Sequence, residues 1–207
     1  MADGSGLKKV LARWRLYWKV AEVGEVARRY FVMNAFDGAL TMLGVVIGSY
    51  LSGIEDPQII IAAGVAGALA MGISGVSGAY MTESAERKKR LKELERAMLR
   101  PMRDTIHEEA HDFATTVVAI VDGLSPALAA ICVISPFFAE HFGLVSPLVA
   151  FYASVGLTLA VLVGLGMYLA KISDESMAKY GARMLLVGVI TAGLCIAIAM
   201  LFGATAA

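Results

Sequence analysis

The stretch MLLVGVITAGLCIAIAMLF, residues 184–202, decides the fold because it is a long apolar run without a single charged side chain. About 20 apolar residues in a helix cross the hydrocarbon core of a bilayer. Similar stretches occur earlier in the chain, and within lipid each must satisfy its own backbone hydrogen bonds as a helix. The sequence therefore predicts an all-α, polytopic membrane protein with five transmembrane helices. The other four expected spans lie near residues 30–51, 58–81, 113–138 and 144–170.

Composition supports this fold class and excludes others. Hydrophobic residues make up 58% of the chain and charged residues 17%, against about 25% charged residues in a typical soluble domain. The 18 basic and 18 acidic residues balance to a formal net charge of zero, which excludes a disordered chain and a strongly basic nucleic-acid binder. Cys132 and Cys195 lie far apart in apolar runs and predict neither a disulfide framework nor a zinc site.

The distribution of lysine and arginine predicts the orientation. These residues are concentrated in the N-terminal segment and in the second loop, whereas the first and third loops and the C-terminal tail hold none. Cytoplasmic loops carry the excess of basic residues, so we expect a cytoplasmic N-terminus and an outside C-terminus, in a prokaryotic plasma membrane or an organelle membrane. The expected parts are an N-terminal amphipathic cytoplasmic segment (1–29), two spans (30–81), a cytoplasmic helical metal-capture segment (82–112) and three spans (113–207).

The N-terminal segment is predicted to form an amphipathic helix over residues 7–29. Trp14, Tyr17 and Trp18 fall on one face at helical spacing, while lysines and arginines occupy much of the other face. Tryptophans suit the headgroup level of a membrane, and basic residues suit anionic lipid. The helix is expected either to lie on the membrane surface or to pack against the protein's own cytoplasmic part.

Asp37, inside the first span, is the leading candidate for chemistry. An aspartate near the bilayer centre costs roughly 2.5–3.5 kcal/mol and usually faces a cavity or a partner. Oxygen ligands beside a softer sulfur suit iron or manganese. The alternative is that Asp37 lies near the cytoplasmic end and only caps the helix or reaches the interface. Its helix face also carries Met33, Thr41, Gly44 and Gly48, with Asn34 beside them.

Two residues of the next spans are further candidates for the transport path. Met71 lies among small residues in the second span and could be a ligand, although a lone methionine more often fills gaps. Asp122 lies one turn before Pro126, which frees the carbonyl of Asp122 from helix hydrogen bonding. Asp122 is expected either to line a polar cavity or to bond a neighbouring helix.

The cytoplasmic segment before the third span combines carboxylates with imidazoles. Glu108 and His111 form a Glu-x-x-His pair, the spacing used by di-iron carboxylate bundles. Carboxylates without basic neighbours in the sequence favour a bound cation, and a plain acidic surface is the alternative. The predicted metal ligands on this helix face are Asp104, His107, Glu108, His111 and Asp112.

Three segments resemble the vacuolar iron transporter family, and the resemblance extends from about Arg28 to the C-terminus. They are NAFDGALTMLGVVIGSY (34–50), AGALAMGISGVSGAYMTESAERK (66–88) and DGLSPALAAICVISPFF (122–138). The resemblance implies a homodimer whose path lies between the two first spans. It also implies export of Fe²⁺ or Mn²⁺ from the cytosol in exchange for protons. Co²⁺ and Zn²⁺ are further candidates for the transported ion, and no resident cofactor is expected.

The resemblance also assigns roles to residues. It implies that Asp37 is the transport carboxylate and that Met71 is a thioether ligand. It further implies that the cytoplasmic segment captures metal, here through Glu83, Glu86, Glu108, His111 and Asp112. The chain departs from the family at Ala79, where a glutamate is usual, and Glu83 one turn later is the candidate replacement.

Other functions remain open at this point. A membrane-anchored metal-binding sensor or scaffold would use the cytoplasmic segment alone, with the spans serving dimerisation. A proton-coupled carrier of an organic solute is the alternative among transporters. An enzyme is not expected, because the sequence lacks a nucleophile–base pair, a phosphate-binding glycine loop and an open zinc triad.

Overall fold

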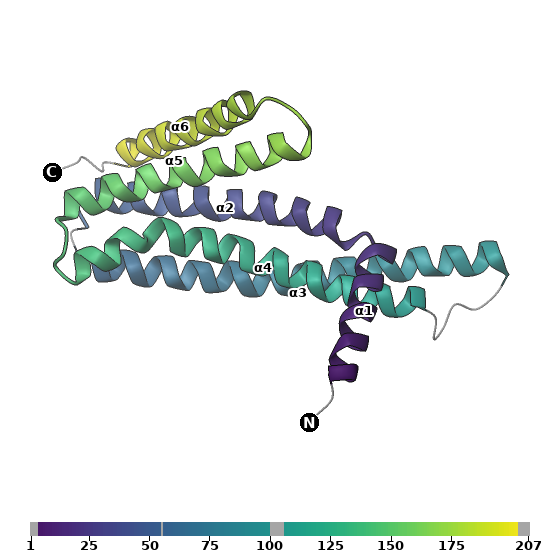
Figure 1. Ribbon diagram of the computed structural model, residues 1–207. Coiled ribbons are helices and arrows are strands. Elements are labelled where there is room, and N and C mark those ends of the chain that lie inside the picture. Colours follow the sequence, from purple (N-terminus) through teal and green to yellow (C-terminus); the bar gives the residue numbers. More distant parts are fainter. Residues whose placement is uncertain (1–3, 55, 100–105, 203–207) are drawn as a thin grey trace. The chain divides into compact units, whose positions relative to one another are not determined.

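The computed structural model describes residues 4–54, 56–99 and 106–202. These residues form six helices and no strand (Figure 1). Five of the helices, α2 to α6, are long and apolar enough to cross a membrane, so the predicted all-α fold with five spans is confirmed. The helices are α1 (Gly4–Val20), α2 (Val23–Leu51), α3 (Pro57–Met98), α4 (Ile106–His141), α5 (Pro147–Ile172) and α6 (Met177–Leu201).

The predicted N-terminal helix over residues 7–29 is interrupted. It ends at Val20, and Glu22 adopts a left-handed backbone conformation with φ of 50°, which a continuous right-handed helix does not contain. Residues 23–29 extend the first span instead, so α2 begins earlier than hydropathy indicates. Gly24 lies close to the end of α1, where an added Cβ would be 3.2 Å from Nε1 of Trp18.

The second span continues into the charged segment after residue 81 as one long helix, as predicted. α3 ends at Met98, and Leu99 has a left-handed φ of 51°. The break expected near Pro101 and the predicted ligand Asp104 lie outside the described residues. α4 then begins at Ile106 and runs through the third span.

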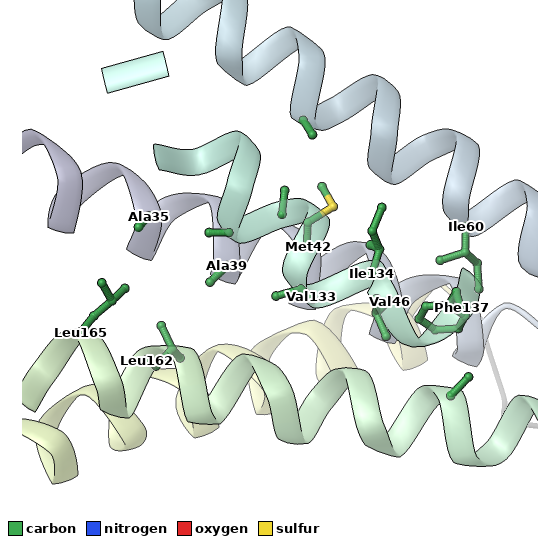
Figure 2. Close-up of a cluster of buried hydrophobic side chains, with 14 of the residues drawn as sticks. Ala35, Ala39, Met42, Val46, Ile60, Val133, Ile134, Phe137, Leu162 and Leu165 are labelled. Carbon is green, nitrogen blue, oxygen red and sulfur yellow. The ribbon is translucent and has the colours of Figure 1, made fainter. Parts of the chain in front are cut away.

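The chain divides into two compact units. The first unit comprises Met1–Phe31 and Ile73–Leu124, and the second comprises Val32–Gly72 and Ser125–Ala207. The second unit has a hydrophobic core built from α2, α3, α4 and α5, which Figure 2 shows around Met42, Val46, Ile134 and Leu162. α2 enters this core with residues three and four apart, which places them on one helix face. They are Val32, Ala35, Ala39, Met42 and Val46.

Glycines allow close helix contacts at particular points of the second unit. An added Cβ at Gly38 would lie 2.3 Å from the carbonyl oxygen of Pro126, and one at Gly64 would lie 2.8 Å from Ile134. Gly44 and Gly48 make no such approach, since the nearest described atom to Gly44 is Sγ of Cys195 at 3.6 Å and Gly48 has open space. Gly44 and Gly48, which have the spacing of a Gly-x-x-x-Gly pair, therefore make no tight contact within the described part of this chain.

The first unit has a smaller core, where α1 packs against the beginning of α4. Tyr17 and Ala21 from this end of the chain are buried with Ala110 and Ala114. Of the two expected placements of the N-terminal helix, packing against the protein itself is thus observed, at the beginning of α4. The helix still exposes Trp14 and Trp18.

Candidate functional site

The Asp37 stripe faces out of the second unit. Ala35 and Ala39, each two residues from Asp37, are only 4% and 0% exposed, and two residues turn a helix by about 200°. Asp37 and Thr41 are exposed, and Met33 is 56% exposed. Three of the predicted transport-path residues on α2, Met33, Asp37 and Thr41, therefore lie on the side of the helix that turns away from the core.

Asn34 and Met71 are less accessible than the stripe. Asn34 is partly buried on α2. Met71, on α3, is partly buried and packs against the core of the second unit. This packing is what a gap-filling methionine does, and a role of Met71 as a ligand stays a prediction.

Asp122 is buried in the first unit, where α3 and α4 approach closely. Asp122 is only 8% exposed. An added Cβ at Gly75 would lie 3.0 Å from Oδ2 of Asp122 and 2.8 Å from Cα of Gly123. The absence of a side chain at Gly75 therefore makes room for the carboxylate and for the helix contact beside it.

A polar network links three helices of the first unit. The hydroxyl of Tyr30 donates to Oε1 of Glu83 at 3.1 Å, and Oε2 of Glu83 lies 3.2 Å from Nε of Arg87. Nη1 of Arg87 lies 3.4 Å from Nδ1 of His111. The side chains of Glu83 and Arg87 are 13% and 8% exposed, so the charges of this pair are largely removed from solvent.

A cavity of about 360 Å³ adjoins this network in the first unit. Carboxylates and an imidazole line it, as predicted from the acidic helix face, but Arg87 and Lys88 of α3 line it as well. No lysine or arginine follows these carboxylates in the sequence until Lys171, but the fold brings cations of α3 to them. The acidic and imidazole lining residues are Glu108, His111 and Asp112.

The predicted capture site is only partly observable. Within the described residues there is no group of three or more His, Cys, Asp or Glu side chains placed to hold a metal ion. Glu83 is held by Tyr30 and Arg87, and Glu86 is exposed. Asp104 and the side chain of His107 lie outside what the structure describes. Metal capture by this segment stays a prediction.

Glu109, next to the predicted ligand Glu108, holds α1 in place. Nη2 of Arg13 donates to both carboxylate oxygens of Glu109, at 2.8 and 2.7 Å, and the hydroxyl of Tyr17 donates to Oε2. The hydrogen bond to Glu109 raises the pKa of Tyr17 and also the pKa of Arg13. The same hydrogen bonds, that of Tyr17 first, lower the pKa of Glu109. The contact is therefore weakened when the tyrosine loses its proton above pH about 10 and when the carboxylate gains one below pH about 4.

Sequence reasoning missed the polar partners that only the fold brings in. Arg87 and Tyr30 were not singled out, since one lies in a charged run and the other at the end of a span. Glu140 was also missed. Its Oε2 is buried without a hydrogen-bond partner in the described residues, and Glu140 lines a cavity of about 20 Å³, which is room for one water.

Comparisons with known proteins agree with this architecture. The model of the VIT family matches residues 28–119, which include Asp37, Met71, Glu83 and Glu108. An uncharacterised protein of Methanocaldococcus jannaschii is 33% identical over 182 residues, a region that covers 86% of this chain and 92% of that protein. The similarity therefore extends over nearly all of the five-span architecture.

Proposed function

The chain belongs to the VIT family, the vacuolar iron transporter family, and from this premise we propose that it exports ferrous iron from the cytosol in exchange for protons. The observation that carries the proposal is the position of Asp37. Its carboxylate is exposed on the face of α2 that turns away from the core of its own unit. Facing lipid near the membrane centre, such a group would cost roughly 2.5–3.5 kcal/mol.

We propose that a second copy of the chain covers this face. In a two-fold dimer the same surface meets itself, so the two Asp37 stripes would line one polar path. Gly44 and Gly48 continue the stripe, and Gly48 has open space at the position of a Cβ. Small residues of this kind permit close approach of helices in a membrane. The space therefore suits a partner helix.

The stripe also suits the proposed substrate. It offers the Asp37 carboxylate, the Thr41 hydroxyl and the Met33 thioether, with the Asn34 amide beside them. This mixture of oxygen and sulfur fits Fe²⁺ or Mn²⁺ better than a hard cation such as Mg²⁺. Protonation of Asp37 from the outside would remove the charge that holds the cation and so release it.

Capture on the cytoplasmic side would precede this step. Glu108, His111 and Asp112 line one cavity of the first unit, and carboxylates with imidazole are ligands for divalent iron. The excess of lysine and arginine in the N-terminal segment and in the second loop supports a cytoplasmic position for this unit. The same asymmetry predicts that the C-terminus lies outside.

Flux in proteoliposomes tests the proposed function. The purified protein would be reconstituted with a metal-sensitive dye inside, and Fe²⁺, Mn²⁺, Co²⁺ and Zn²⁺ would be added with and without a pH gradient. The proposal predicts that Fe²⁺ enters the vesicles while protons leave them. Entry should be faster when the proton concentration is higher inside the vesicles than outside. Metal binding without flux would favour a sensor or scaffold, and flux of an organic solute alone would favour the other carrier.

A further inference from the structure

An apolar groove of about 620 Å³ runs between α1 and α4 within the first unit. We propose that this groove binds one acyl chain of an anionic phospholipid, with the lipid phosphate at Arg15. The inference concerns a lipid site outside the proposed ion path and does not depend on the transported substrate. The lining residues on which the argument rests are Trp14, Arg15, Trp18, Phe113, Val117 and Ile120.

Specific contacts beside the groove hold its two walls together. The bidentate contact of Arg13 with Glu109 joins α1 to α4. The rings of Trp14 and Tyr17 lie 6.0 and 5.8 Å from the ring of Phe113, centroid to centroid. The groove is therefore a built feature of the first unit, formed by the same packing that buries Tyr17.

The chemistry of the groove favours a lipid chain. Trp14 is 53% exposed, Trp18 is 45% exposed and Ile120 is 46% exposed, and apolar surface of this extent is unfavourable in water. Phe113 follows Asp112 and begins the apolar run of a membrane span. The groove therefore begins where α4 leaves the charged cytoplasmic segment, and seven residues on, at Ile120, it has gone about 10 Å along the helix.

The basic residue of α1 that lines the groove favours an anionic lipid headgroup. Arg15 lines the groove, and Lys19 follows one turn later on α1. Tryptophan side chains prefer the level of the lipid headgroups. A basic residue near the cytoplasmic surface attracts anionic lipid by about 1 kcal/mol. A phosphodiester with a net negative charge therefore satisfies Arg15, while its acyl chain covers the apolar wall.

Tryptophan fluorescence tests this site directly, because Trp14 and Trp18 are the only two tryptophans in the sequence. The full chain would be reconstituted in phosphatidylcholine vesicles that contain increasing amounts of a brominated phospholipid, a contact quencher. The expected result is an apparent association about fivefold stronger for brominated phosphatidylglycerol than for brominated phosphatidylcholine, from the contribution of one basic residue.

Two charge-matched variants separate the groove from the general surface charge. Arg15→Gln is expected to bring the preference for phosphatidylglycerol close to one. Lys19→Gln removes the same charge from the same helix but does not touch the groove, and it should keep most of the preference. An equal loss in both variants would overturn the proposal, as would equal quenching by the two lipids in the unaltered protein. Emission that neither lipid quenches would mean that protein covers the groove, which would also overturn it.

Discussion

Arg87 contacts atoms that would serve as ligands of a captured cation. Its guanidinium contacts Oε2 of Glu83 and Nδ1 of His111. A guanidinium can only donate hydrogen bonds, so the contact with His111 uses the Nδ1 lone pair and leaves the ring proton on Nε2. A divalent cation would use the same lone pair and the same carboxylate. If this segment captures the proposed substrate, Arg87 would compete with the cation for these two atoms.

We predict that Arg87→Gln strengthens cation binding to the purified protein by about tenfold, which corresponds to about 1.4 kcal/mol. The reason is that two charges about 4 Å apart interact by up to about 4 kcal/mol at a protein surface, and part of this repulsion is relaxed when the arginine moves. Titration calorimetry with Mn²⁺ or Co²⁺ measures the change. Arg90→Gln, which removes an exposed charge from the same helix, is the control and should leave the affinity near that of the unaltered protein. Weaker or unchanged binding in Arg87→Gln would contradict the competition.

The residues of the candidate site differ in how far the sequence could identify them. The outward face of Asp37 follows from spacing, since its stripe alternates with the Ala35 and Ala39 positions that pack inward. Arg87 could not be found in this way. It stands in a run of basic residues, and only the packing of α3 against α4 makes it 7% exposed while its neighbour Lys88 stays exposed. The sequence alone does not tell how close α3 and α4 lie to each other.

At the scale of elements, the contact between α3 and α4 depends on Gly75. We predict that Gly75→Ala destabilises the protein by about 1–3 kcal/mol, because the added methyl group meets Gly123 and the Asp122 carboxylate at about 3 Å. Thermal unfolding in detergent measures this effect as a lower Tm.

Gly78→Ala is the matched control on the same helix, one turn later. An added Cβ at Gly78 meets no described atom within 4 Å. Alanine is a better helix former than glycine by about 0.8–1.0 kcal/mol, so this variant should be neutral or slightly more stable. A Tm that falls equally in both variants would show that the close approach at Gly75 is not the cause.

The attachment of α1 gives a second prediction at this scale. Glu109→Gln removes the carboxylate that accepts hydrogen bonds from Arg13 and Tyr17. An ion pair as exposed as this one holds the helix only weakly, so amide hydrogen exchange in α1 should become up to about fivefold faster. Glu25→Gln, an exposed position on α2, should leave this exchange unchanged. Unaltered exchange in Glu109→Gln would mean that aromatic packing alone holds α1.

Helix identities were predictable, but one helix boundary was not. The five spans follow from long apolar runs, and the continuation of α3 into the charged segment follows from helical spacing. The end of α1 at Val20 depends on the left-handed conformation of Glu22. Glutamate has no preference for that conformation, so nothing in the sequence marks the break.

The part of the chain that the structure describes holds five candidate spans, and if all five cross the membrane, the two termini lie on opposite sides of it. We predict that a protease site fused before Met1 is cut only from the cytoplasmic side, and that one fused after Ala207 is cut only from the other side. The asymmetry of lysine and arginine is the reason. Cleavage of both sites from one side would contradict the five-span topology.

The sequence says least about how copies of the chain pair with one another. Gly44 and Gly48 permit a partner helix but do not require one, and the same small residues could have packed within the chain. In the structure the close contacts of α2 and α3 within the second unit use Gly38 and Gly64 instead, and the Asp37 face remains exposed. The proposed dimer path rests on this exposed carboxylate.

Flux through Asp37→Asn proteoliposomes is therefore the most direct test of the account. The variant keeps the size of the side chain but removes its charge, and we predict that Fe²⁺ flux falls at least about a hundredfold, which corresponds to about 2.7 kcal/mol. Asp56→Asn makes the same change at an exposed position before α3 and should retain flux. Flux of the unaltered rate through Asp37→Asn, in protein that is folded and equally reconstituted, would contradict a role for this carboxylate in carrying the ion.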